Sequence, residues 1–138
     1  MCTSGTAVAN YHPALLEADT SRVPLIVLTG DRPHELRNLG APQTADQIKV
    51  FGDAVRFFNE MPIPSSSPSS IAYARQMAFE AYVRATGELP GPVHLNFPFA
   101  EPLKPDLQAE GLFETGRRSG EGADAKSPLL VSGTRVLS

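Results

Sequence analysis

The sequence predicts an α/β fold with a mainly parallel sheet flanked by helices, and three observations support this prediction. Helical and extended patterns alternate along the first hundred residues, which is typical of a chain that winds through parallel strands. Residues 23–29 (VPLIVLT) are apolar without alternation, as in a strand that is covered on both faces. A long helical pattern ends at Gly87 and leads into the extended residues 92–97 (PVHLNF).

The chain opens with residues that we interpret as the end of a strand followed by a turn. Residues 1–3 are too few to form a strand by themselves, but they can be the last residues of one. Gly5 permits a tight turn, and Ser4 or Thr6 can cap the helix that follows.

A helical pattern then covers residues 7–19, with Leu15 and Leu16 on the side that we expect to be buried. Pro13 lies inside this pattern and lacks an N–H group. The helix therefore either starts near His12 or kinks at the proline.

The middle of the chain contains shorter elements. Residues 30–43 form a loop rich in proline, glycine and charge. We predict a short helix over residues 45–51 and a short strand over residues 54–58 (AVRFF).

The best-defined helix follows Ser67, which is a suitable N-cap, and begins with Pro68, which suits the first helical position. Glu80 and Arg84 can pair on its exposed side. Gly87 ends the helix. Its apolar positions share one face: Ile71, Ala74, Met77, Ala78, Ala81 and Ala85.

Composition limits the classes of function. The chain has 138 residues, a net charge of -3 and one cysteine, Cys2. This charge does not favour nucleic acid or an anionic membrane as a partner. The sequence has no apolar run long enough for a transmembrane helix and no pair of cysteines for an internal disulfide, so we expect a cytoplasmic protein.

Beyond Glu101 the composition changes. Residues 104–127 carry proline, glycine and charge with little periodicity, and we predict a linker there. Residues 128–138 are more apolar and are the possible start of a further element.

Ligands of parallel α/β sheets bind beyond the carboxyl ends of the strands. Residues 3–6, 30–33 and 97–99 lie at such ends in the predicted order. The first of these segments offers backbone N–H groups and hydroxyls at a helix start, which suits an anion or a polar heterocycle. Small residues before a helix are also common as a plain turn and cap, so both interpretations stay open.

Two further residues are candidates for ligand binding. Arg32 follows a buried strand and can grip a carboxylate, or it can pair with Asp31, Glu35 or another acidic side chain. Gln43 can donate to a ligand oxygen, or it can be solvated in its loop.

The histidines do not predict a metal site. His12, His34 and His94 lie in three different segments, without the spacing of metal ligands. His94 alternates with Val93 and Leu95 in the expected last strand, which favours a structural histidine with satisfied hydrogen bonds.

Longer stretches carry a resemblance to a known family. Residues 2–52 and 91–103 resemble the SEPHCHC synthases, a family of thiamine-diphosphate-dependent enzymes of menaquinone biosynthesis. The stretches TSGTAVAN, DRPHEL and HLNFPF occur in the family's order and at plausible distances, and the likeness covers about residues 2–107.

The resemblance implies an incomplete pyrimidine-binding domain, the first of three α/β domains. It places residues 1–103 in this domain, with its first half missing, residues 104–127 in a linker and residues 128–138 at the start of the central domain.

The resemblance also implies the site residues. Ser4, Gly5 and Thr6 match the turn beside the cofactor's pyrimidine, and Asn10 matches a polar position on the following helix. Two further matches concern the substrate: Arg32 matches an arginine that binds a substrate carboxylate, and Gln43 matches a glutamine that binds substrate. This sequence departs from the family's pattern nearby, with Pro42 where some relatives have Asn and Gly30 where Ala is common.

The activity implied by the family is decarboxylation of 2-oxoglutarate and addition of the succinyl unit to isochorismate, with thiamine diphosphate and Mg²⁺. The implied assembly is a homo-oligomer, a dimer or a tetramer. No residue here matches the family's activating glutamate or its metal-binding motif, so we assign no catalytic and no metal-binding residue and expect no turnover by this chain alone.

Two alternatives stay open beside this activity. The chain can be a non-catalytic fragment, or it can be an α/β module that binds another carboxylate through Arg32.

Overall fold

A computed structural model of the chain describes residues 1–104. The expected linker, beyond its first residue, and the expected element over residues 128–138 lie outside the described part. The proposed domain boundary at residue 103 therefore stays a prediction.

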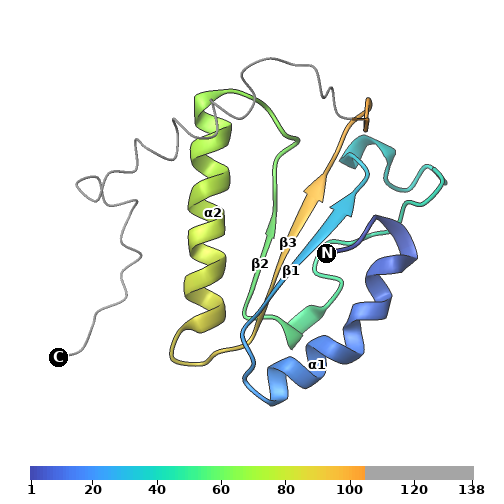
Figure 1. The fold of residues 1–138 in the computed structure, drawn as a ribbon. Coiled ribbons are helices and arrows are strands. Elements are labelled where there is room, and N and C mark those ends of the chain that lie inside the picture. Colours follow the sequence, from blue (N-terminus) through green and yellow to red (C-terminus); the bar gives the residue numbers. More distant parts are fainter. Residues whose placement is uncertain (105–138) are drawn as a thin grey trace.

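Three parallel strands form the centre of the fold. They are β1 (Leu25–Asp31), β2 (Phe57–Glu60) and β3 (Pro92–Pro98), and their order in the sheet is β1-β3-β2. All three carboxyl ends therefore lie at one edge of the sheet, where the strand arrows point in Figure 1. The predicted α/β class with a mainly parallel sheet is confirmed.

The two α-helices cover opposite faces of this sheet. The helix α2 (Pro68–Thr86) packs on the face that carries Val93 and Leu95, while α1 (His12–Thr20) packs on the other face. Within residues 1–104, no helix is both long enough and apolar enough to cross a membrane.

A 3-10 helix, η1 (Gly5–Tyr11), precedes α1. The α-helix therefore begins at His12, which confirms the predicted start near this residue rather than a kink at Pro13. The backbone N–H of His12 donates to the carbonyl of Ala9, three residues earlier. Because Pro13 has no N–H and its ring crowds the carbonyl four residues before it, a regular α-helix cannot run through this point.

The helix α2 begins and ends as the sequence predicts. Ser67 is its N-cap, and the hydroxyl accepts a hydrogen bond from the Ser70 N–H at 3.2 Å. Pro68 occupies the first turn and Gly87 follows the last helical residue.

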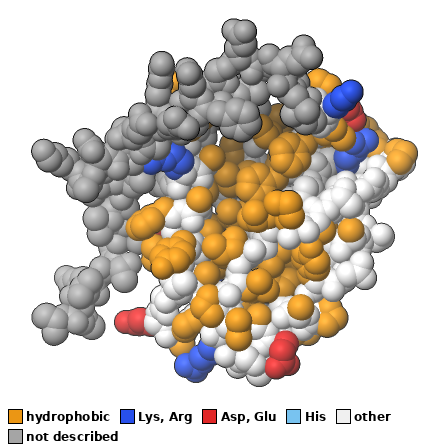
Figure 2. All heavy atoms as spheres, in the orientation of Figure 1, with side chains coloured by type: hydrophobic (Ala, Val, Ile, Leu, Met, Phe, Trp, Pro, Cys, Tyr) orange, Lys and Arg blue, Asp and Glu red, His pale blue; other side chains and the backbone are white. Residues whose placement is uncertain are grey.

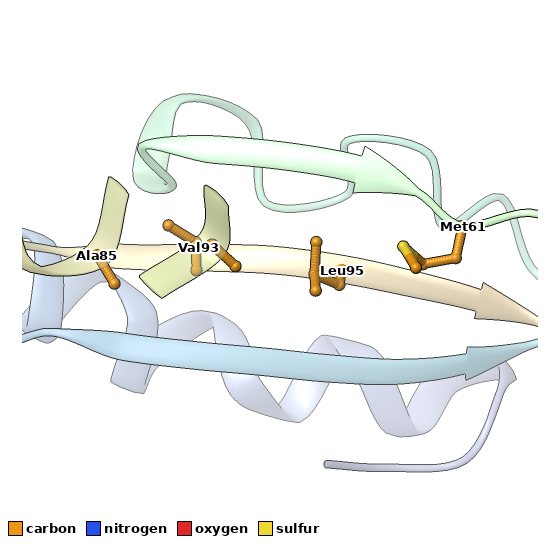
Figure 3. Packing of buried hydrophobic residues seen from close by; sticks show 5 residues of the cluster. Met61, Ala85, Val93 and Leu95 are labelled. Atoms are coloured by element: carbon orange, nitrogen blue, oxygen red, sulfur yellow. The ribbon is translucent and has the colours of Figure 1, made fainter. Parts of the chain in front are cut away.

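The apolar core has two clusters, one on each face of the sheet. The cluster under α2 is shown in part in Figure 3, along the face of β3; its buried members are Met61, Ala81, Ala85, Val93 and Leu95. The cluster under η1 and α1 has as buried members Val8, Leu15, Val27 and Phe51.

The short helix predicted over residues 45–51 is wrong, because these residues form turns and loop. Gln47 and Phe51 are both buried, which produces a helix-like spacing of four in the sequence. The backbone between them bends instead, since Lys49 has a φ of 50°.

Two strands begin later than predicted. The pattern predicts strands over residues 23–29 and 54–58, whereas β1 and β2 begin at Leu25 and Phe57. Val23 and Pro24 complete the connection from α1, and the Val23 N–H bonds to the Ala18 carbonyl at 2.8 Å.

Cys2 pairs in parallel with Thr29 of β1, so residues 1–3 do contain a strand position, as expected. The Cys2 N–H donates to the Leu28 carbonyl at 3.1 Å, and the Gly30 N–H donates to the Cys2 carbonyl at 2.9 Å. Beyond this one bridge, the described residues put no strand on the outer side of β1.

The expectation that β1 is covered on both faces is wrong for the described part. Burial alternates along β1, and Ile26 is 42% exposed. Leu16, which was expected on the buried side of its helix, is also half exposed. Figure 2 shows apolar side chains gathered over the sheet between α2 and the β1 side of the molecule.

Candidate functional site

The candidate site lies at the carboxyl edge of the sheet, where three segments meet. The turn after the Cys2 bridge provides Ser4 and Gly5, and the end of β1 provides residues 30–32. The loop between β1 and β2 returns to the same edge and brings Gln43 against the turn.

The turn predicted at Ser4–Thr6 is formed, and Gln43 contacts it directly. Ser4 is buried, and its hydroxyl donates to the Gln43 carbonyl at 2.9 Å. The Gln43 amide donates to the Thr3 hydroxyl at 2.9 Å. Ser4 stands at the N-cap of η1 without a side-chain capping bond, because its hydroxyl is used by Gln43 instead.

Gly5 is required by the backbone of this turn. Its φ is 81°, in the left-handed region that side chains disfavour. A Cβ built on Gly5 would lie 3.2 Å from atoms of Gln43. Thr6 follows on the exposed side of η1.

Asn10 is four residues beyond Thr6 on η1 and is exposed. Its amide donates to the Ala7 carbonyl at 3.4 Å. In the described residues it therefore belongs to its own helix and makes no hydrogen bond with the Ser4 turn or Gln43.

Arg32 lies at the end of β1 and is held weakly. Its Nη1 atom is 3.4 Å from the Glu101 carboxylate, which is 70% exposed. The ion-pair partner is thus Glu101, which is the other acidic side chain that the sequence alternatives allowed beside Asp31 and Glu35. The Nε atom is buried and has no hydrogen-bond partner among the described residues.

Sequence reasoning missed a buried polar network behind the turn. Its five members are Thr29, Asp31, Gln47, His94 and Asn96. Thr29 Oγ1 lies 2.7 Å from both His94 Nε2 and Asn96 Oδ1. One signal in the sequence could have revealed this network. Polar residues lie two positions apart in each of two neighbouring strands, Thr29 and Asp31 in β1 and His94 and Asn96 in β3.

Gln47 and Asn96 connect this network to the turn. Gln47 accepts a hydrogen bond from the Gly5 N–H at 2.8 Å and donates to Asn96 Oδ1 at 2.9 Å. Asn96 in turn donates to Asp31 Oδ2 at 2.8 Å. The turn is therefore bonded to β3 and, through Asn96, to the end of β1.

Arg37 holds the ends of two strands. Its Nη2 atom lies 2.9 Å from Asp31 Oδ2 and also bonds Glu60 at the end of β2. The Asp31 side chain is fully buried, so this pair neutralises a buried charge.

His94 is structural, as the sequence favours, but its hydrogen bonds are not all satisfied, because its buried Nδ1 has no partner among the described residues. Its ring is fully buried, bonded to Thr29 and in edge contact with Phe51. Burial lowers the pKa of His94 to about 4, although the nearby Asp31 carboxylate raises it in part. The imidazole is therefore neutral at neutral pH.

Several hollows border this end of the sheet. One of about 410 Å³ adjoins the turn; its lining is mostly apolar and consists of Met1, Cys2, Thr3, Leu28, Thr29, Gly30, Phe97 and Phe99. Another of about 540 Å³ lies between α2 and residues 61–65. We place the site at the first, because polar groups converge beside it.

These residues fit part of a heterocyclic cofactor. Hydroxyl and amide groups converge at the turn, beside an apolar hollow that can take a flat ring. Within residues 1–104, no three His, Cys, Asp or Glu side chains are grouped in a way that could hold a metal ion.

The chain is similar to known proteins along its length. Residues 1–50 match the family described as thiamine pyrophosphate enzyme, N-terminal TPP binding domain. The chain is 53% identical over 137 residues to the 2-succinyl-5-enolpyruvyl-6-hydroxy-3-cyclohexene-1-carboxylate synthase of Oceanobacillus iheyensis, a match of 99% of this chain and 23% of the relative.

Two further relatives carry the same name. The one from Listeria innocua is 50% identical over 118 residues, which is 86% of this chain and 20% of the relative. The one from Halorubrum lacusprofundi is 55% identical over 105 residues, which is 76% of this chain and 17% of the relative. The chain thus spans about a fifth of the length of the curated relatives it matches.

Proposed function

Because the chain belongs to the SEPHCHC synthase family of thiamine-diphosphate-dependent enzymes, we propose that it forms part of a transferase of menaquinone biosynthesis. This enzyme decarboxylates 2-oxoglutarate and adds the succinyl unit to isochorismate. The observation that carries the proposal is the identity of 53% over 99% of the chain to a relative with that name.

In this proposal the Ser4–Thr6 turn borders the pyrimidine ring of thiamine diphosphate, and Asn10 adds a polar group from the following helix. The cofactor, when bound, supplies the chemistry that stabilises a carbanion, and the protein binds and orients the reactants. Hydroxyl and amide groups at the turn support the assignment, since they can hydrogen-bond a ring nitrogen or amino group.

Arg32 and Gln43 bind carboxylated substrate in this proposal. A pair as long and as exposed as Arg32 with Glu101 contributes little free energy, so a substrate carboxylate can replace Glu101 at small cost. Gln43 lies beside the turn, which puts its amide near a substrate placed on the cofactor.

The remaining parts of the site come from outside the described residues in this proposal. We assign Mg²⁺, its ligands and the group that activates the cofactor to the rest of the enzyme, which acts as a homo-oligomer, a dimer or a tetramer. The chain alone then has no turnover.

A chimaeric protein tests the proposal. In it, this chain replaces the matching 137 residues of the Oceanobacillus iheyensis relative. With thiamine diphosphate and Mg²⁺, the chimaera should release CO₂ from 2-oxoglutarate and consume isochorismate, and the chain alone should do neither. A folded chimaera that binds no thiamine diphosphate would contradict the proposal and favour a non-catalytic fragment.

The Nε atom of Arg32, which is buried and has no hydrogen-bond partner within residues 1–104, favours a second candidate, an α/β module that binds carboxylates without turnover. Titration of the chain alone with 2-oxoglutarate should then give heat that is lost in Arg32→Ala and kept in Arg84→Ala, a control on the exposed side of α2. Equal heats in both variants would eliminate this candidate.

A further inference from the structure

We infer that Gln47 is a positioning residue, which holds the Ser4–Thr6 turn against the ends of β1 and β3 and so sets the turn's affinity for the cofactor. The inference rests on the proposed function for the role of the turn. Gln47 itself touches neither cofactor nor substrate in this assignment, because its side chain is buried behind the turn.

The side chain of Gln47 is 1% exposed, and both ends of its amide are used. Its Oε1 atom accepts from the Gly5 N–H at 2.8 Å. Its Nε2 atom donates to the Gly30 carbonyl at 3.0 Å and to Asn96 Oδ1 at 2.9 Å. One side chain thus joins the turn, the end of β1 and β3.

The Gly5 backbone depends on this hydrogen bond for two reasons. As the first residue of η1, Gly5 has an N–H that finds no partner within the helix. Its left-handed φ of 81° is one of several conformations that a glycine can adopt. The bond to Gln47 selects this one, and the side chains of Ser4 and Thr6 on either side take their directions from it.

The orientation of the Gln47 amide is itself determined by a charge. Asp31 is buried, and its Oδ2 accepts from Asn96 Nδ2 at 2.8 Å. This bond turns Asn96 Oδ1 toward Gln47, which must then present its Nε2 to Asn96 and its Oε1 to Gly5. Each donor in this chain of hydrogen bonds therefore points from the turn toward the carboxylate of Asp31, which fixes the orientation of both amides.

Gln43 has a different position, which separates the two glutamines. It is exposed at the front of the turn and contacts Thr3 and Ser4. Gln47 lies behind the turn in the core of the polar network. Removing the Gln43 side chain should change substrate contacts, whereas removing the Gln47 side chain should loosen the turn.

The test uses the full-length chimaera with Gln47→Met, which fills the space without hydrogen bonds, and Gln47→Glu, which keeps an acceptor for the Gly5 N–H but loses the donor to Gly30 and Asn96. The control is Gln76→Met, on the exposed surface of α2. Two quantities are measured: amide hydrogen exchange of residues 4–10, and the Kd for thiamine diphosphate by calorimetry with Mg²⁺.

We expect Gln47→Met to exchange faster over residues 4–10 and to bind thiamine diphosphate about tenfold more weakly. Of the three hydrogen bonds that this variant removes, only the one from the Gly5 N–H reaches the turn, and the loss of one such bond has about this effect. Gln47→Glu should recover neither property, because its second carboxylate oxygen would face the Gly30 carbonyl and Asn96 Oδ1, which both accept hydrogen bonds. Gln76→Met should match the parent. A purely structural role would lower the melting temperature without raising the Kd of the folded protein.

Unchanged exchange in Gln47→Met overturns the inference, and so does faster exchange with an unchanged Kd. If Gln47→Met does not fold, Gln47→Asn decides, because its amide is one methylene too short to span Gly5 and Asn96. A Kd raised about tenfold then supports the inference, and a Kd within about threefold of the parent overturns it. A parent chimaera that binds no thiamine diphosphate marks failure of the proposed function instead, and hydrogen exchange alone then decides whether Gln47 holds the turn.

Discussion

At the scale of single residues, Gly5 combines two constraints that can be separated by experiment. Its φ is 81°, and an added Cβ would meet Gln43 at 3.2 Å. Gly40 has a similar φ of 68° but open space around the Cβ position. The two glycines therefore form a matched pair in which only Gly5 carries the close contact.

We expect Gly5→Ala to lower the free energy of unfolding by about 2 kcal/mol or more, because it adds a contact to the left-handed backbone cost of about 1 kcal/mol. Gly40→Ala should show the backbone cost alone. Urea denaturation of both variants measures the difference. Equal losses would mean that Gln43 moves away freely and that the turn is not tightly built.

His94 predicts a pH dependence of stability. Its pKa is lowered to about 4 in the folded protein, against 6.5 in the unfolded chain, because the ring is buried. Below pH 6.5 the unfolded state takes up a proton that the folded state refuses. The free energy of unfolding should therefore have its full value above pH 6.5 and fall by roughly 3 kcal/mol as the pH approaches 4.

Unfolding measured between pH 4 and 7 checks this, with NMR titration of the His94 ring beside it. The control is His34→Gln, which removes an exposed histidine. The free energy of unfolding of this variant should depend on pH as it does in the parent. A ring that titrates near pH 6.5 in the folded protein would contradict the burial argument.

At the scale of elements, the loop between β1 and β2 is anchored at two points. Arg37 joins the loop to Asp31 and Glu60, at the ends of β1 and β2. Gln47 joins it to the turn and to β3. Gln43 lies between these anchors, so its place against Ser4 depends on both.

Arg37→Met should lower the free energy of unfolding by about 3 kcal/mol, because it leaves the buried carboxylate of Asp31 without its cation. Arg84→Met is the matched control, since it breaks an exposed pair with Glu80 on α2 and should cost about 0.5 kcal/mol or less. Chemical denaturation compares the two. A loss at Arg37 no larger than at Arg84 would show that Asp31 is satisfied by its neutral neighbours alone.

At the scale of the whole molecule, the described sheet is open on one side. Only Cys2 pairs with the outer edge of β1 in residues 1–104, and Ile26 is 42% exposed beside that edge. An unpaired parallel edge with apolar side chains is a site of association. We therefore expect the isolated chain to be marginally stable or to aggregate.

Ile26→Lys should reduce this self-association, because a charge at a sheet edge opposes pairing with another strand. Tyr82→Lys is the control, since Tyr82 is 60% exposed on α2, away from the edge. Sedimentation velocity over a range of concentrations measures both. A parent chain that stays monomeric with a sharp thermal transition would contradict the expectation.

Much of the fold and part of the site could be predicted from sequence. The bounds of α2 follow from Ser67, Pro68 and Gly87, whose effects are local. The Ser4 turn was predicted for the same reason, because Gly5 is the residue that a left-handed turn needs. The prediction of a helix over residues 45–51 was wrong, because the spacing of Gln47 and Phe51 reflects two separate burial sites, one polar and one apolar.

The sequence by itself determined the alternation of helices and strands, the turn at the sheet edge and the family to which the chain belongs. Only the tertiary structure decided what holds that turn. Gly5 and Gln47 are 42 residues apart, and Thr29 and His94 are 65 apart. Such pairs meet only when parallel strands align in one register, and no local preference of the residues specifies that register.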